Sequence, residues 1–310
     1  MPSKSLKSTL LMCFAAAIAG CGGGGGGGTP PPPAPEPTPP PPVPFHSFQD
    51  IQPNQTVAMT GGISQTASGT ADMSGTITSA TLGPVDTANS TATLSYDPLL
   101  ALHGASIATP QSNVSFSAPG DMVTCTTGVC DLSSSTADAV VIDGRGVGWN
   151  YQTFGLWATA PTATTWLTGA ISVGNPTPAS AVPTTGTATF TGLAAGLYID
   201  PMGAIFGTAA NMTANVDFSA RSIGFGTSST MVTDTNGIQS SNSNIDLSGT
   251  LTYAAGTNQF SGSVQTSDKT LNGSATGKFY GPNAEEIGGV YGLSAGTGVS
   301  GMLGAFGGKR

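Results

Sequence analysis

Alternation of apolar and polar residues in the C-terminal half constrains the fold of this 310-residue chain more than any other feature. Successive side chains of a β-strand point to opposite faces, so such a run predicts a strand with one apolar face. Helical periodicity is almost absent. The clearest apolar sets are Met212, Ala214, Val216 and Phe218; Ile245, Leu247, Gly249, Leu251 and Tyr253; and Leu271, Gly273, Ala275, Gly277 and Phe279. The sequence therefore predicts an all-β fold.

Turn signals divide residues 186–309 into eight runs of strand length. Eight antiparallel strands with small residues on the apolar face are typical of a closed barrel, which also removes the edges of the sheet. Membrane barrels show the same alternation, but no aromatic girdle marks the strand ends here. We therefore expect a soluble barrel, with Leu251 and Phe279 inside it and Thr250 and Lys278 outside.

Residues 46–180 are also β-rich, but their alternation is less regular. We expect them to form a smaller, open sheet packed beside the barrel. The boundary is expected at 174–185, where Pro176, Pro178 and Pro183 interrupt strand pairing. The folded region is thus predicted to contain a β-rich domain at 45–180 and an eight-stranded antiparallel barrel at 181–310.

The first 20 residues have the layout of a secretory signal peptide, with Lys4 and Lys7 before an apolar run that is too short to span a bilayer. This run ends in Ala19-Gly20-Cys21, which resembles the bacterial lipobox. We therefore predict that Cys21 becomes the first mature residue and carries fatty acyl chains such as palmitate. Residues 21–44, rich in glycine and proline, are predicted to be a tether that lifts the folded region from a membrane surface.

The charged residues are few, 16 acidic and 8 basic, and give a formal net charge of −8. An acidic protein is a poor electrostatic partner for nucleic acid or for an anionic membrane surface. We therefore expect no nucleic-acid partner, and membrane contact only through the lipid anchor.

Two parts of the sequence resemble the barrel signature of the transferrin-binding protein B family of surface lipoproteins. They are residues 277–289 with the closing segment 304–310, and residues 183–192, which would be the first barrel strand. The resemblance implies that the β-rich domain at 45–180 is a handle domain preceding the eight-stranded barrel. It also implies location on the outer-membrane surface and often a role in iron or haem acquisition. The full receptors carry two such lobes, whereas residues 45–310 hold one, so transferrin is not implied as the partner.

The leading hypothesis is a non-enzymatic surface protein for solute or partner binding, which captures a host protein or haem. An outer-membrane receptor or export machinery would be a second partner. A structural or protective surface lipoprotein without a small-molecule ligand is the alternative. A hydrolase depends only on the G-x-S-x-G pattern around Ser294, which needs a later histidine, and none follows His103. We therefore predict no catalytic residues.

His103 is a candidate haem ligand because a neutral imidazole binds iron, although an ordinary position in the handle is the competing interpretation. No other cofactor is expected. The sequence has no cluster of cysteine and histidine with zinc spacing, so no metal site is predicted. Cys125 and Cys130 are expected to form a disulfide, as two nearby cysteines of an exported protein usually do.

An aromatic cluster precedes the domain boundary and consists of Trp149, Tyr151, Phe154, Trp157 and Trp166. Packing between handle and barrel is the favoured interpretation. The alternative is an exposed patch that contacts a partner, which makes these five residues candidates for partner binding.

Glu285 and Glu286 are adjacent carboxylates, a pattern that invites an acid/base interpretation. Neighbouring side chains of a strand point to opposite faces, so the two carboxylates are not expected to share a substrate. We assign the pair a structural role.

Overall fold

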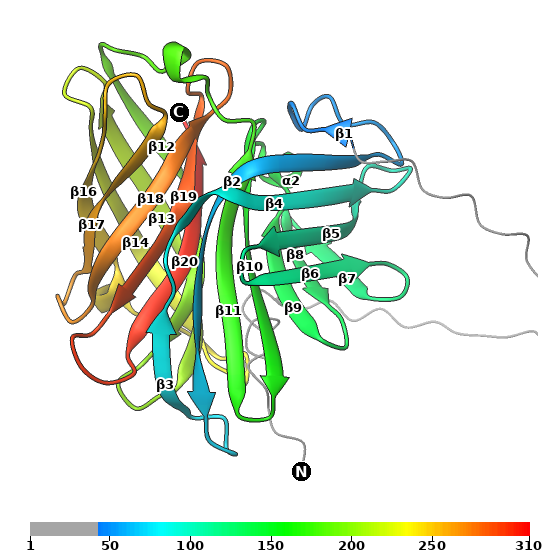
Figure 1. Cartoon of the computed structure of the whole chain (residues 1–310), viewed down its shortest axis with the longest axis vertical. Helices are drawn as coiled ribbons and strands as arrows, with labels where there is room; N and C mark the ends of the chain where they lie inside the picture. The colour runs from blue at the N-terminus through cyan, green and yellow to red at the C-terminus, as the bar shows by residue number, and fades with distance from the viewer. Residues whose placement is uncertain (1–42) are drawn as a thin grey trace, which may run out of the picture.

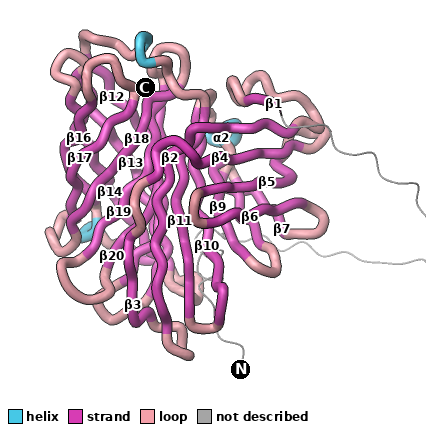
Figure 2. The backbone as a smooth tube through the Cα atoms, viewed as in Figure 1, coloured by secondary structure: helices cyan, strands magenta, loops and turns pink. Residues whose placement is uncertain are grey.

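The computed structural model describes residues 43–310, which form two β-domains side by side (Figure 1). Strands and loops make up almost all of this backbone (Figure 2). The helical elements are α2 (Gly144–Val147) and the 3-10 turns η1 (Ala179–Ala181) and η2 (Ser243–Ile245). The all-β prediction is confirmed. Within residues 43–310, no helix has the length and apolar character needed to cross a membrane.

The predicted signal peptide, the lipidation site Cys21 and the tether up to residue 42 lie outside the described residues. The described chain begins with the short strand β1 (Val43–Pro44), which pairs with the start of β2. This pairing fixes where the preceding segment joins the folded region.

Eight strands form the C-terminal barrel: β12 (Thr187–Ile199), β13 (Ile205–Asp217), β14 (Ser222–Thr233), β16 (Leu247–Tyr253), β17 (Gln259–Thr266), β18 (Asn272–Tyr280), β19 (Glu286–Ser294) and β20 (Gly301–Lys309). All neighbouring pairs are antiparallel. The ring closes because β13 pairs with both β12 and β14, and β12 pairs with β20. A short strand, β15 (Gln239–Ser241), pairs with the last residues of β14. The eight-stranded barrel predicted from alternation is confirmed.

Aromatic side chains fill the barrel around Phe279, which is fully buried. The centroid of its ring lies 5.4 to 6.2 Å from those of Phe190, Phe218, Tyr253 and Phe260. Gly277 leaves room for this cluster, because a Cβ there would lie 2.4 Å from the Phe260 ring. Leu251 is buried and Thr250 is exposed, as predicted from the alternation. The barrel therefore fills its interior with its own side chains.

The handle is a single 11-stranded sheet. Its strands are β1, β2 (Thr56–Ala71), β3 (Ile77–Leu82), β4 (Asp86–Tyr96), β5 (Leu102–Thr109), β6 (Ser112–Ser117), β7 (Met122–Thr126), β8 (Val129–Ser133), β9 (Ala137–Ile142), β10 (Gln152–Thr162) and β11 (Thr165–Gly174). The pairing order is β6-β5-β4-β2-β11-β10-β9-β8-β7, and β1 and β3 also pair with β2. The end strands β6 and β7 contact each other.

The expectation of a smaller, open sheet is wrong, because the handle has more strands than the barrel and its edges nearly meet. The 16-residue strand β2 explains the difference. Register shifts at residues 59–64 bend it, so one edge pairs with β4 before the bend and with β3 after it, while β11 lies along the other edge. Bulges of this kind increase the curvature of a sheet.

The two domains share an apolar core between them. From the handle it includes Ile63, Ile142, Phe154, Leu156 and Trp166, and from the barrel it includes Leu197, Ile205, Val290, Leu303 and Ala305. Strands β2, β10 and β11 of the handle contact β19 and β20 of the barrel. We call this contact surface the junction.

Candidate functional site

Alternation along β19 and β20 divides their side chains between the barrel interior and the junction. On β19, Ile287, Tyr291 and Leu293 belong to the barrel core. Val290 of β19 and Leu303 of β20 face outward into the shared core. The outer wall of these two strands is therefore the surface on which the handle rests.

Glu286 anchors one end of the junction, which we call the closed end. Its side chain is 2% exposed, and its carboxylate accepts hydrogen bonds from the backbone N–H groups of Asn150 (2.5 Å), Tyr151 (2.9 Å) and Gln152 (2.9 Å). Burial raises the pKa of Glu286, while these N–H groups and the charge of Lys309 oppose the rise. A carboxylate of the barrel thus holds the start of β10 in place.

Two glycines let the handle approach the closed end. Gly288 and Gly307 are cross-strand partners on the outer wall of the barrel, and the fully buried side chain of Gln152 lies against both. A Cβ on Gly307 would lie 2.3 Å from Gln152 Nε2, and one on Gly288 would lie 2.7 Å from Gln152 Oε1. Both glycines belong to the segments that resemble the barrel signature. Close approach of the handle is a physical reason for glycine there.

Lysines of the barrel also contact backbone carbonyl groups of the handle. Lys278 Nζ donates to the carbonyl oxygens of Gly61 (2.7 Å) and Thr87 (2.9 Å), and Lys309 Nζ donates to Gly148 O (2.8 Å). Lys278 lies on the outer face of the barrel, as expected from the alternation, but the handle half-buries it. That burial lowers the pKa of Lys278.

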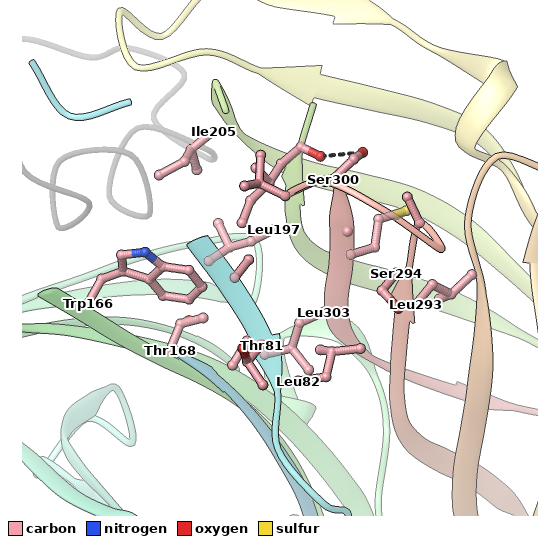
Figure 3. A pocket seen from close by; sticks show the side chains of 18 residues that line it. Thr81, Leu82, Trp166, Thr168, Leu197, Ile205, Leu293, Ser294, Ser300 and Leu303 are labelled. Carbon is pink, nitrogen blue, oxygen red and sulfur yellow. Dashed lines mark hydrogen bonds between the residues drawn. The ribbon is translucent and has the colours of Figure 1, made fainter. Parts of the chain in front are cut away.

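The other end of the junction, the open end, contains a cavity of about 320 Å³ (Figure 3). The handle contributes Trp166 and Leu82 to its walls, and the barrel contributes Leu197 and Leu303. Figure 3 shows Trp166 and Ser294 on opposite sides of this space. Residues 294 to 303, from the end of β19 into β20, supply half of the remaining lining residues, and none of the lining residues is charged.

Three hairpin turns also lie at the open end: 72–76 between β2 and β3, 200–204 between β12 and β13, and 234–238 between β14 and β15. We call them the outer turns. The first two are joined by a hydrogen bond from Ile77 N to Gly203 O (2.9 Å). The third lies at the same end because β12 and β14 both run antiparallel to β13.

Each outer turn is stiffened by the aspartate that begins it. Oδ1 of Asp200 accepts the backbone N–H groups of Met202 (2.8 Å) and Ala204 (2.9 Å), and Asp72 and Asp234 bind the N–H groups two and four residues onward in the same way. Large apolar side chains are nevertheless exposed in these turns: Met73 (74%), Met202 (81%) and Ile238 (65%).

The aromatic residues considered for partner binding do not form an exposed patch. Trp149, Phe154 and Trp166 are buried in the core shared by handle and barrel, and Trp157 is buried in the core of the handle itself. Tyr151 is half-buried beside Gly281. The exposed-patch alternative is wrong at the four buried positions, because the apolar faces of the two sheets need large side chains to fill the space between and within them.

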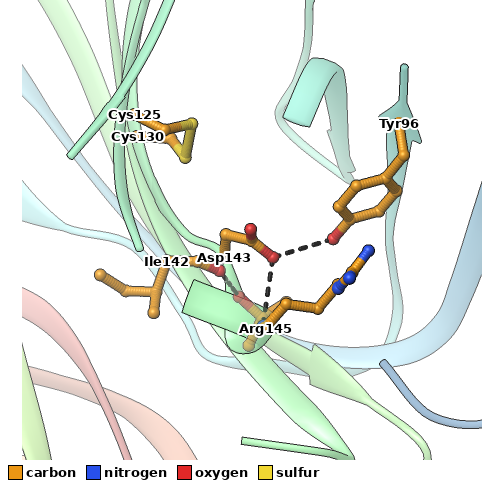
Figure 4. The surroundings of a disulfide bond; sticks show 7 residues. Tyr96, Cys125, Cys130, Ile142, Asp143 and Arg145 are labelled. Atoms are coloured by element: carbon orange, nitrogen blue, oxygen red, sulfur yellow. Dashed lines mark hydrogen bonds between the residues drawn. A yellow bond between two sulfur atoms is a disulfide. The ribbon is translucent and has the colours of Figure 1, made fainter. Parts of the chain in front are cut away.

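The structure joins Cys125 and Cys130 in a disulfide across the β7–β8 pair (Figure 4). Asp143 precedes α2 nearby and accepts hydrogen bonds from the Tyr96 hydroxyl (3.1 Å) and from Arg145 N (3.2 Å). Burial raises the pKa of Asp143. These contacts belong to the internal structure of the handle.

The haem candidate His103 is exposed on β5, and His46 is exposed near the start of the described chain. Neither histidine lines the cavity at the open end. Within residues 43–310, no group of three or more His, Cys, Asp and Glu side chains is placed to hold a metal ion.

Gln152, the role of Lys278 and the exposed apolar residues of the outer turns were not predicted from the sequence. The turns had a signal, because the sequence repeats an aspartate followed three residues later by glycine at 72–75, 200–203 and 234–237. Such a pattern predicts an aspartate-capped turn, and an apolar residue inside it is expected to be exposed. Gln152 and Lys278 had no signal, since their burial depends on contacts between the two domains.

Residues 182–310 match the family model described as the C-lobe and N-lobe beta barrels of Tf-binding protein B. The C-terminal domain is therefore a barrel of this type. The described chain thus carries a barrel similar to those of Tf-binding protein B, preceded by a β-rich handle. No curated protein matches the sequence.

Among solved structures, transferrin binding protein B from Haemophilus parasuis Hp5 is 15% identical, with 71% of this chain and 51% of that chain covered and a TM-score of 0.44. The isotype 1 protein from serogroup B Neisseria meningitidis is 22% identical, with 64% and 38% covered and a TM-score of 0.39. The N-lobe of lactoferrin binding protein B from Moraxella bovis is 11% identical, with 81% and 99% covered and a TM-score of 0.40. The chain thus spans about half, or less, of the two transferrin binding proteins.

Proposed function

We propose that this protein is a lipid-anchored binding protein of the outer-membrane surface and that it captures a host protein through the outer turns. The observation that carries this proposal is the exposure of Met73, Met202 and Ile238 on three stiffened turns at one end of the molecule. Exposed apolar groups on a rigid support are typical of protein-binding surfaces.

The position of the outer turns fits a tethered protein. The chain enters the described structure at β1, beside Val57 and Ala58 at the start of β2, and the turn at 72–76 follows the end of β2. A strand of this length spans at most about 50 Å. An anchor at Cys21 would hold the entry side toward the membrane and present the outer turns away from it.

The barrel's own aromatic side chains fill its interior and leave no room for a ligand there. We therefore expect a partner to dock on the outside of the molecule. The Tf-binding protein B type of barrel makes iron acquisition from a host protein the role that we propose. Haem has weaker support, because both histidines are exposed and neither lines the cavity.

The test uses the mature chain, immobilised with Cys21→Ser in place of the lipid anchor, and host serum as the source of partners. Replacing Met73, Met202 and Ile238 together with serine should lower the affinity for the captured protein at least tenfold, since apolar anchors in an interface commonly contribute more than about 1 kcal/mol each.

Leu99→Ser is the matched control. Leu99 is 88% exposed in another aspartate-capped turn, which lies at the entry side because Asn54 N donates to Asp97 O. This control should keep full affinity. An equal loss in both variants, or no loss in either, would reject the outer turns as the site. Failure to capture any serum protein would instead favour the structural or protective alternative.

The proposed anchor has its own test in the native organism. Cys21→Ser should abolish labelling by radioactive palmitate and block processing, because the cysteine thiol is the acceptor of the first lipid. Normal labelling of that variant would exclude lipidation at Cys21 without affecting the test of the outer turns.

A further inference from the structure

The cavity at the open end is formed by both domains, and its volume of about 320 Å³ lies at the lower end of the range of small-molecule sites. About ten molecules occupy this volume in liquid water. We propose that this cavity binds a small, uncharged and largely apolar molecule.

The lining determines the chemical class of the ligand. Leu82 and Trp166 of the handle face Leu197, Ile205 and Leu303 of the barrel, and no charged residue takes part. A charged ligand would lose its hydration here without gaining a counter-ion, which is costly. An apolar body would instead gain contact with aliphatic side chains and one indole ring.

Hydroxyl groups add a polar contact at the edge of this apolar space. Those of Thr168 and Ser300 are already used, since they donate to Trp157 O (2.6 Å) and Ile199 O (2.8 Å). Thr81 and Ser294 also line the cavity, are exposed, and have no side-chain hydrogen bond within residues 43–310. They suit a ligand that carries one hydroxyl or carbonyl group at the end of its apolar body.

Comparison with the closed end argues against a simple packing defect. At the closed end the handle fills the space over Gly288 and Gly307 with the side chain of Gln152. At the open end small residues, Ala67 and Ala80 of the handle, line the space that larger side chains would fill. The same two sheets thus pack tightly at one end and leave a lined cavity at the other.

The ligand is unidentified, so the experiment uses the neutral apolar fluorophore N-phenyl-1-naphthylamine with the mature Cys21→Ser chain. We expect saturable enhancement of its fluorescence, accompanied by quenching of tryptophan emission because Trp166 lines the cavity. 1-Decanol should displace the fluorophore at a concentration at least about tenfold lower than decanoate, which has the same chain length but carries a charge.

Two variants decide whether the cavity is the site. Ala80→Phe narrows it and should weaken binding of the fluorophore at least about tenfold. Ala210→Phe is the matched control, because Ala210 lines a second crevice of about 310 Å³ between the handle and β13, and this variant should bind normally. Thermal unfolding checks that both variants fold. If Ala80→Phe does not fold, Ala295→Phe replaces it, since Ala295 lies in the loop that walls the cavity.

Unsaturable enhancement, equal binding by Ala80→Phe and Ala210→Phe, or displacement by decanoate as readily as by 1-decanol would overturn the proposal. The proposal is independent of protein capture. The serine variants of the outer turns should still bind the fluorophore, and Ala80→Phe should still capture the serum protein.

Discussion

The barrel and the handle consist of the same kind of strand, but they differ in how they bury polar groups. In the described barrel, the buried side-chain atom left without a hydrogen-bond partner is the hydroxyl of Tyr253. In the handle, buried atoms of Gln65, Asp131, Gln152 and Trp157 lack partners. Two of these residues, Gln65 and Gln152, lie against bare glycines of the barrel wall.

This difference indicates separate tasks for the two domains. A closed sheet pairs its own strands and fills its interior locally, so the barrel is a rigid support. The handle places polar side chains against that support. Burying their polar atoms without hydrogen-bond partners costs folding free energy. A barrel core packed mainly from aromatic and aliphatic side chains thus contrasts with a hydrogen-bonded junction and with a handle that contains a costly charge.

The largest effect is expected in the barrel core. Phe279→Ala should lower the free energy of unfolding by about 3 to 5 kcal/mol, because the cavity would open in the centre of four surrounding aromatic rings. Phe206→Ala, a matched change at a half-buried ring of β13, should cost only about 1 kcal/mol. Urea unfolding measures both, and similar costs would contradict the tightly packed barrel core.

At the closed end of the junction, Glu286→Gln should lower the free energy of unfolding by about 2 kcal/mol. An amide has one acceptor oxygen, and its NH2 group would face a backbone N–H that the carboxylate now accepts. Hydrogen exchange at Asn150, Tyr151 and Gln152 should become faster.

The neighbouring variant Glu285→Gln is the control. The Glu285 carboxylate accepts hydrogen bonds from the backbone N–H and side-chain amide of Asn283, on the turn before β19. The cost of Glu285→Gln should therefore stay within about 0.5 kcal/mol. A result in which Glu285→Gln costs as much as Glu286→Gln would show that the junction does not depend on the buried carboxylate.

In the handle, burial raises the pKa of Asp131 to about 6 from its usual value of 3.8. The folded state therefore favours the protonated form, so stability is greatest below the unfolded-state pKa and falls as pH rises through about 6. Asp131→Asn should remove this fall and stabilise the protein by about 1 kcal/mol at pH 7, a value reduced for solvent screening of a partly exposed group.

The same pair of proteins supplies the control for Asp131. At about pH 4, where the aspartate is largely protonated in the folded state, wild type and Asp131→Asn should have nearly equal unfolding temperatures. A difference that is the same at both pH values would mean that the effect is not electrostatic.

Sequence alone predicted the barrel well and the handle poorly, for a physical reason. Most barrel strands have one face inside and one toward solvent, so period-2 alternation marks them, as in residues 271–280. The exceptions β19 and β20 are buried on both faces, because the handle covers their outer wall. The handle strands β9, β10 and β11 are buried on both faces along much of their length, which removes the alternation. Bending of β2 at its bulges has no simple sequence pattern either.

The site was less predictable than the fold, since it depends on contacts across the junction. The family resemblance correctly placed residues 277–289 in the barrel, where they form the end of β18, a turn and the start of β19. The role of Gly288 is visible only once Gln152 lies against it. The sequence drew attention to the clustered tryptophans but gave no way to tell their positions apart. The structure places Trp157 in the handle core, whereas Trp166 lines the cavity at the open end.

The smallest effect is expected at Ser294, where the open end leaves a hydroxyl without a protein partner. The G-x-S-x-G elbow requires a strand followed by a helix, whereas Ser294 ends β19 and the chain continues through a loop into β20. Ser294→Ala should therefore change the free energy of unfolding by less than about 0.5 kcal/mol. Neither protein should release nitrophenol from short-chain nitrophenyl esters above the buffer rate, and ester hydrolysis that disappears with Ser294→Ala would overturn the interpretation of this chain as a binding protein.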